Sequence, residues 1–187
     1  LHLQIHLQKN VMYLKQKIES NNIAIERVLD YDKINKFIDN LPYKLTLDQS
    51  SSIKEILKDL ESKKRMNRLL QGDVGSGKTI VAFIAIYANY LSKYQSALMA
   101  PTEILAGQHY EDALKIFSKY KLKIALLTSS TSAKDKKEIY DNLELGKIDL
   151  IIGTQALIQD RVKFKKLGLV VTDEQHRFGV RQRSKIV

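Results

Sequence analysis

Cysteine is absent from this 187-residue chain, and glycine occurs only eight times. A chain without cysteine has no disulfide framework, no thiolate metal site and no cysteine nucleophile. No apolar run approaches the roughly 20 residues of a membrane span, so we expect no membrane partner. The first residues also lack the apolar core of a signal peptide. These absences favour a reducing compartment, and we expect a cytoplasmic protein.

Negative charge is scarce, with 21 Asp and Glu against 31 Lys and Arg, and the formal net charge is +10. Such an excess suits a polyanionic partner such as nucleic acid. A lysine-rich, solvated surface would give the same balance, and no aromatic-interleaved platform for single strands is visible. The charge therefore permits nucleic acid binding without establishing it.

Three of the eight glycines fall within the run Gly72-Asp73-Val74-Gly75-Ser76-Gly77-Lys78-Thr79. The run fits the phosphate-binding pattern of Gly, four residues and Gly-Lys-Ser/Thr, although an ordinary glycine-rich turn is the alternative. Its backbone N–H groups would surround the phosphates, Lys78 would face the outer ones, and Thr79 would bind Mg²⁺. A strand-length run precedes the loop and an apolar helix follows it, which is the setting that the motif requires.

From Pro42 onward the chain alternates helices and strands. We expect helices at about Thr46–Leu60, Lys78–Ser92, Glu103–Tyr120 and Ala133–Leu145, and strands at Arg68–Gln71, Ala97–Ala100, Lys123–Leu127, Leu150–Ile152 and Leu167–Thr172. This alternation predicts an α/β fold with a doubly wound, mostly parallel sheet. Ligands in such sheets bind at the carboxyl ends of the strands, where the glycine loop lies.

The first 40 residues are predicted to be helical. Apolar side chains recur there at three- and four-residue steps, at Leu3, Leu7, Val11, Leu14 and Ile18. A second helix is expected from about Ile23 to Leu41, with a break near Asp30. We interpret residues 1–41 as an α-helical linker and residues 42–187 as a nucleotide-binding domain.

A second chemical feature follows the last expected strand, where an apolar run leads into Asp173-Glu174-Gln175-His176. In a phosphate-loop enzyme, Asp173 would hold Mg²⁺ and Glu174 would orient and deprotonate the attacking water. A polar turn after a strand is the alternative, but the glycine loop upstream makes the acid pair more informative. His176 would relay between the nucleotide site and a partner site.

Together these segments resemble the RecG family of ATP-dependent DNA helicases. The glycine loop and Asp173–Val180 carry the resemblance, and Leu41–Gln49, Ala100–Tyr110 and Gly153–Gln159 agree with it. It covers about residues 41–183 and implies a RecA-like first motor domain that hydrolyses ATP with Mg²⁺. Gln49 would recognise adenine with help from Tyr43. The residues expected to face the DNA backbone are Pro101, Thr102, Glu103, Gly153 and Thr154.

The resemblance also implies partners outside these residues. We expect a fragment truncated at its carboxyl end, with a wedge domain and a second RecA-like domain in the same full-length chain. The whole would be a monomeric, bacterial, nucleoid-associated motor that remodels stalled forks and Holliday junctions in recombination and repair. The fragment alone should hydrolyse ATP poorly.

Several alternatives remain open. One is a related helicase of the transcription-repair coupling or PriA type, although Gln175 and Pro101-Thr102-Glu103 favour RecG. A phosphate-loop ATPase or kinase independent of DNA is a second. A nucleic-acid module with a vestigial nucleotide site is a third, and the intact Lys78 and acid pair argue against it.

Overall fold

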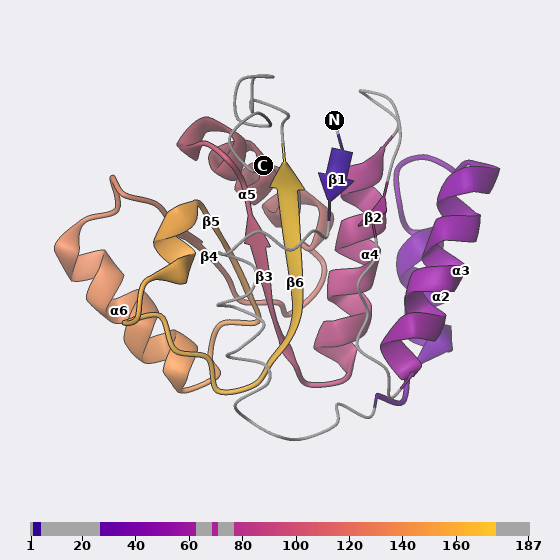
Figure 1. Cartoon of the computed structure of the whole chain (residues 1–187). Helices are drawn as coiled ribbons and strands as arrows, with labels where there is room; N and C mark the ends of the chain where they lie inside the picture. The colour runs from indigo at the N-terminus through magenta and orange to yellow at the C-terminus, as the bar shows by residue number, and fades with distance from the viewer. Residues whose placement is uncertain (1, 5–26, 63–68, 71–76, 175–187) are drawn as a thin grey trace, which may run out of the picture.

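The computed structural model describes residues 2–4, 27–62, 69–70 and 77–174. A six-stranded sheet in the order β2-β1-β6-β3-β5-β4 forms its centre (Figure 1). The strands are β1 (His2–Gln4), β2 (Leu69–Leu70), β3 (Gln95–Met99), β4 (Ile124–Leu127), β5 (Leu150–Gly153) and β6 (Leu167–Glu174). The helices are α2 (Tyr31–Asp39), α3 (Leu47–Glu61), α4 (Lys78–Leu91), α5 (Glu103–Ile116) and α6 (Ala133–Glu144), with a 3₁₀ turn, η1 (Gln155–Ile158).

Four neighbouring strands, β6-β3-β5-β4, are parallel, as the alternation of helices and strands predicted. Met99 of β3 pairs with both Gly153 of β5 and Thr172 of β6. The carboxyl ends of these strands therefore lie at one edge of the sheet, where a doubly wound fold binds its ligand. The predicted α/β fold class is confirmed.

The prediction of helix at the start of the chain is wrong for residues 2–4. They form β1, which runs antiparallel between β2 and β6, pairing Leu3 with Leu70 and with Asp173. The residues alternate apolar and polar from Leu1 to Leu7, a period of two that suits a strand. Leu3 and Leu7 belong to this alternation as well as to the steps of four that predicted a helix. The rest of the predicted first helix lies outside the described residues.

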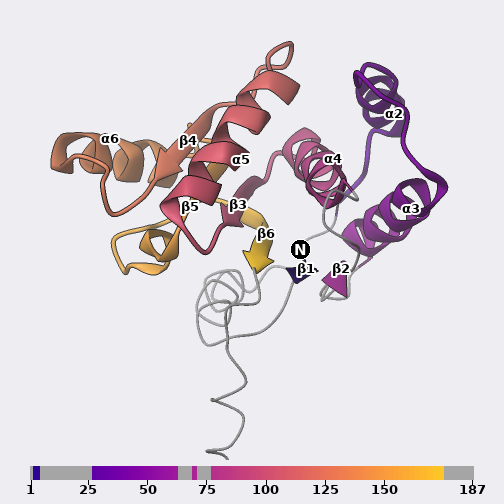
Figure 2. The ribbon, with the colours of Figure 1, turned by 90° about the horizontal axis from the view of Figure 1, so that it is seen from above.

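Both faces of the parallel sheet are buried. Successive side chains of a strand point to opposite faces, so neighbouring residues belong to different cores. Leu98, Ile152 and Val171 face the core that includes α2, α3, α4 and α5, whereas Ala97, Ile151 and Val170 face a second core that includes Leu143 of α6. Helices α2 to α5 thus pack on one face, and α6 and η1 contribute Leu143, Ala156 and Leu157 to the core on the other (Figure 2).

Side-chain caps fix where the helices begin. Thr46 and Gln49 form a capping box at α3, in which the Thr46 hydroxyl accepts from the Gln49 backbone N–H at 3.2 Å. Thr102 caps α5 and Ser132 caps α6 in the same way. Each cap satisfies a backbone donor that the first turn leaves without a partner. The start predicted near Thr46 is confirmed.

The described part of the predicted linker packs on the same core as the helices that follow it. Phe37 of α2 is 1% exposed, and its ring centroid lies 4.4 Å from that of Tyr87 and 5.6 Å from that of Phe117. Arg27, just before α2, donates to the Asn89 side chain and to the backbone carbonyls of Leu60 and Gly168. Burial lowers the pKa of Arg27 to about 10, which leaves it protonated at neutral pH. The domain boundary at residue 41 stays a prediction.

Phe37→Ala should destabilise the fold by about 3–5 kcal/mol, because it removes a fully buried ring and leaves a cavity between α2 and α4. Urea unfolding followed by circular dichroism would measure the loss. Lys36→Ala, on the exposed side of the same helix, should change stability by less than about 0.5 kcal/mol. Equal, small effects of both changes would mean that α2 is not part of the core.

Candidate nucleotide site

The described part of the glycine loop is its last three residues, Gly77, Lys78 and Thr79. Gly77 is the N-cap of α4 and has a φ of +71°, in the left-handed region that favours glycine. A Cβ there would lie 2.2 Å from Nε2 of Gln49, so a larger residue would also displace the Gln49 side chain. The preceding loop residues, Gly72, Asp73, Val74, Gly75 and Ser76, lie outside the described residues, and their roles stay predictions.

Lys78 is the first residue of α4 and is buried, with 8% of its surface exposed. A cation at this position faces the positive end of the helix dipole, and α4 has no acidic residue in its first turn. A bound anion would interact favourably with both the helix N-terminus and the Lys78 ammonium group. The arrangement therefore fits the phosphates of a nucleotide. Thr79, beside Lys78, is half-buried.

Asp173 lies near the end of β6 and is 5% exposed. Leu3 of β1 pairs with both Asp173 and Leu70, so Asp173 is level with the last residue of β2. Two strand spacings separate these positions, a distance of roughly 10 Å. The sheet thus brings Asp173 to the same edge as Leu70, which precedes the first glycine of the loop by two residues in the sequence. Glu174 is the last residue of the same strand, and His176 lies outside the described residues.

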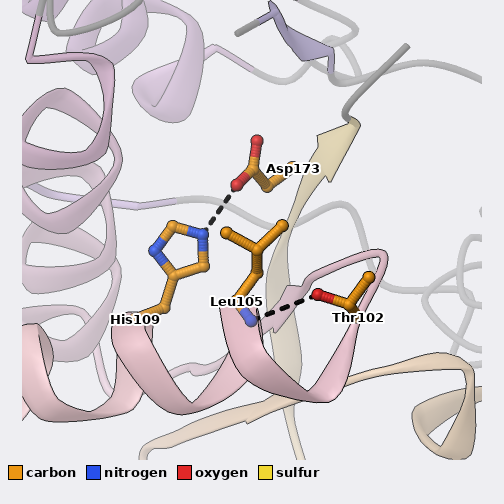
Figure 3. Close-up of polar contacts among 4 residues, drawn as sticks. All are labelled: Thr102, Leu105, His109 and Asp173. Carbon is orange, nitrogen blue, oxygen red and sulfur yellow. Dashed lines mark hydrogen bonds and ion pairs between the residues drawn. The ribbon is translucent and has the colours of Figure 1, made fainter. Parts of the chain in front are cut away.

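The nearest described partner of Asp173 is His109, which sequence reasoning did not assign to the site. Nε2 of His109 lies 2.7 Å from Oδ2 of Asp173, and both side chains are buried (Figure 3). Because an ionised carboxylate can only accept, the imidazole is the donor to the ionised form. The sequence spacing could have indicated that His109 is buried, since Ala106, His109 and Ala113 are spaced to share one face of a helix. A polar residue on a buried face needs a partner.

The residues also fit a magnesium ion. Among the residues that the structure describes, no cluster of three or more His, Asp or Glu side chains is arranged to bind a metal. Mg²⁺ in nucleotide sites needs no such cluster, because it is held by one or two protein oxygens, by water and by the phosphates. The Thr79 hydroxyl and the Asp173 carboxylate are oxygen ligands of the required kind.

A family model described as DEAD/DEAH box helicase matches residues 46–187. The chain belongs to this family. The matched range contains the glycine loop, His109 and Asp173. The RecA-like fold implied by the resemblance is confirmed.

Within this family, the chain is most usefully compared with RecG proteins. The ATP-dependent DNA helicase RecG of Bacillus subtilis (strain 168) is 57% identical over 163 residues, which cover 87% of this chain and 24% of that protein. RecG of Staphylococcus aureus (strain NCTC 8325 / PS 47) is 53% identical, with 92% and 25% coverage. The chain therefore spans about a quarter of the length of these relatives. The resemblance to RecG helicases is confirmed.

A solved structure agrees with the sequence comparison. The structure of RecG bound to a three-way DNA junction superposes with a TM-score of 0.78 at 47% identity, covering 89% of this chain and 23% of that one. In the present helicase chain, no helix within the described residues is long and apolar enough to cross a membrane.

The two residues expected at adenine differ in their surroundings. Oε1 of Gln49 accepts from the Thr46 backbone N–H at 2.9 Å, and its Nε2 donates to the Gly77 carbonyl at 3.4 Å. Gln49 thus joins the start of α3 to the end of the glycine loop. Tyr43 is half exposed, and partial burial raises the pKa of its hydroxyl. Adenine recognition by these side chains stays a prediction.

The residues expected at DNA lie at the carboxyl ends of β3 and β5. Pro101 and Thr102 are exposed, and the Thr102 hydroxyl accepts from the Leu105 backbone N–H at 3.2 Å (Figure 3). Gly153 ends β5, where a Cβ would lie 2.1 Å from the Leu127 carbonyl oxygen. Thr154 stands at the N-cap position of η1 but makes no side-chain cap there.

Glu103 has a partner within the protein. Its carboxylate accepts from the hydroxyls of Ser129 and Ser130 and from the Ser130 backbone N–H. These hydrogen bonds lower the pKa of Glu103. The carboxylate therefore holds the loop after β4 beside the start of α5. Contact of Glu103 with DNA stays a prediction.

Gly77→Ala should weaken nucleotide binding by about tenfold or more. Alanine in the left-handed region costs roughly 1–2 kcal/mol, and its Cβ would also displace the Gln49 amide. The rise in unfolding temperature on adding Mg-ATP would measure the change. Gly107→Ala is a matched control, because a Cβ there meets nothing within 4 Å. A full thermal shift in the Gly77 variant would contradict the prediction.

Proposed function

We propose that this chain is the first motor domain of an ATP-dependent DNA helicase that acts on branched DNA. The observation that supports it most is the convergence of Lys78, at the start of α4, and Asp173, at the end of β6, on one edge of the sheet. The RecG relatives are named ATP-dependent DNA helicases, and one solved relative is bound to a three-way DNA junction.

In this proposal, each side chain of the site has one task. Lys78 binds the outer phosphates of ATP, and Thr79 and Asp173 hold Mg²⁺. When bound, Mg²⁺ neutralises charge that develops on the phosphates. Glu174 orients the attacking water and accepts its proton. Gln49 and Tyr43 bind adenine, and His176 connects the site to its partner domain.

The other surface of the proposed motor contacts the DNA backbone. Thr102 and Thr154 offer hydroxyls, the backbone N–H groups around Pro101 and Glu103 add further donors, and Gly153 precedes Thr154 in the same segment. These segments follow β3 and β5, at the same edge of the sheet as Asp173. Hydrolysis at one part of the edge can therefore respond to DNA at another.

The rest of the motor belongs to the full-length protein. We propose a wedge domain before residue 1 and a second RecA-like domain after residue 187, since the chain spans about a quarter of its relatives. The second domain completes the ATP site with arginine fingers. The full protein acts as a monomer in the bacterial cytoplasm, associated with the nucleoid.

Remodelling of a synthetic three-way junction tests this function. The full-length protein should separate or convert fluorescently labelled junction arms when ATP and Mg²⁺ are both present, and should leave them intact with a non-hydrolysable analogue. A linear duplex of equal length is the matched control and should be processed far more slowly. An equal rate on both substrates would contradict branched-DNA action, and inactivity on both would contradict the motor itself.

A further inference from the structure

We propose that His109 is a positioning residue that couples DNA contact at the start of α5 to the metal-binding carboxylate of Asp173. The inference rests on the proposed function, because it assigns a route between the two surfaces of the same motor. It begins from one buried hydrogen bond, in which Nε2 of His109 lies 2.7 Å from Oδ2 of Asp173.

The hydrogen bond leaves the carboxylate available for its proposed task. Only Oδ2 of Asp173 is engaged by the imidazole, and Figure 3 shows the other carboxylate oxygen directed away from the ring. Partners of this kind fix the orientation of a metal ligand, and their loss commonly costs 10- to 100-fold in metal affinity or activity. His109 therefore restricts the rotation of Asp173 without occupying its second oxygen.

The position of His109 in α5 supplies the link to DNA. Seven residues, or about 10 Å of helix, separate it from Thr102, the cap of α5 in the segment expected at DNA. Ala106 and Ala113 flank His109 on the buried face, and both are completely buried. These small side chains let the helix pack closely, so a displacement of its start would move His109 with it.

The hydrogen bond also connects different parts of the sheet. α5 packs on β4 and β5, whereas Asp173 belongs to β6, and β3 lies between β5 and β6. His109 thus reaches from a helix seated on one side of β3 to a strand on the other. A shift of α5 relative to β6 would change the orientation of Asp173.

Two amide variants separate this role from simple packing. Glutamine can place its Nε2 donor near the position of the imidazole Nε2, whereas the shorter asparagine cannot. In the full-length protein at saturating Mg-ATP, His109→Asn should lower the turnover stimulated by a three-way junction by about tenfold. It should also raise the Mg²⁺ concentration needed for half-maximal turnover. His109→Gln should stay within about threefold of the unsubstituted protein in both measurements.

Glu111→Ala, an exposed change on the same helix, is the control and should alter neither measurement. Equal losses in the two amide variants, no loss in either, or a greater loss with glutamine would overturn the proposal. So would an unfolding temperature for His109→Asn more than about 5 °C below that of His109→Gln, because the role would then be structural.

The unsubstituted protein distinguishes the inference from the function on which it rests. If its turnover does not respond to the junction, the proposed DNA motor fails. If it responds and His109→Asn responds equally, only the coupling role of His109 fails.

Discussion

Lys78→Ala in the full-length protein reduces ATP turnover by about 100- to 1000-fold, the usual cost of removing one preorganised group that stabilises transition-state charge. Lys78 is the buried first residue of α4, at the end of the helix that favours anions. No alanine side chain can replace that charge. Steady-state hydrolysis at saturating Mg-ATP and saturating forked DNA measures the loss.

Junction binding should survive the same substitution, because the residues expected at DNA belong to other segments. Lys58→Ala, which removes an exposed lysine from α3, is the matched control and should change turnover less than twofold. A Lys78 variant that folds normally but no longer binds the junction would contradict this division of tasks. So would a Lys78 variant that retains most of its turnover.

Asp173→Asn is expected to have a similarly large effect, about 100- to 1000-fold on turnover. The amide oxygen can still accept from His109, so the buried contact and the fold should persist. The amide nitrogen, however, carries no negative charge and donates instead of accepting at the side expected for Mg²⁺. Turnover measured over a range of Mg²⁺ concentrations should lose its steep rise.

Asp149→Asn is a matched control for that experiment. Oδ2 of Asp149 accepts from the Lys123 backbone N–H at 2.8 Å, just before β5 and at the opposite end of the parallel strands. The amide oxygen can keep this hydrogen bond, and the side chain is remote from the site. Equal Mg²⁺ dependence in the two variants would contradict a metal-holding role for Asp173.

Much of the fold was predictable because its local signals agree with one another. The apolar run after the glycine loop becomes α4, which is buried along most of its length, and Thr46 with Gln49 forms the expected start of α3. The acid pair is predictable from its strand, although β6 extends through Glu174 instead of ending at Thr172. Pairing with β1 accounts for the extension.

The wrong prediction of helix at residues 2–4 arises where tertiary contacts decide between two local patterns. The residues around Leu3 carry both a period of two and steps of four, and pairing with β2 and β6 selects the strand. Three donors from the loop after β4 to the Glu103 carboxylate were not predicted, and contact of Glu103 with DNA stays a prediction. The partners of Leu3 and those of Glu103 are all distant in the sequence.

The role suggested for His109 was equally hard to predict from sequence alone. A single histidine has no spacing pattern, and its partner Asp173 is 64 residues away. Only the parallel register, which places the end of β6 beside β3 and the start of α5, brings the two together. The sequence indicates that His109 lies on a buried helix face, but it does not indicate which polar group is its hydrogen-bond partner.

DNA-stimulated ATP turnover by the full-length protein tests the central claim most directly. Hydrolysis should be slow without DNA and rise at least about tenfold on adding a three-way junction, with Mg²⁺ required in both cases. Fast turnover that is unchanged by any DNA would contradict the account, because the nucleotide site would then work independently of the surface expected to bind DNA.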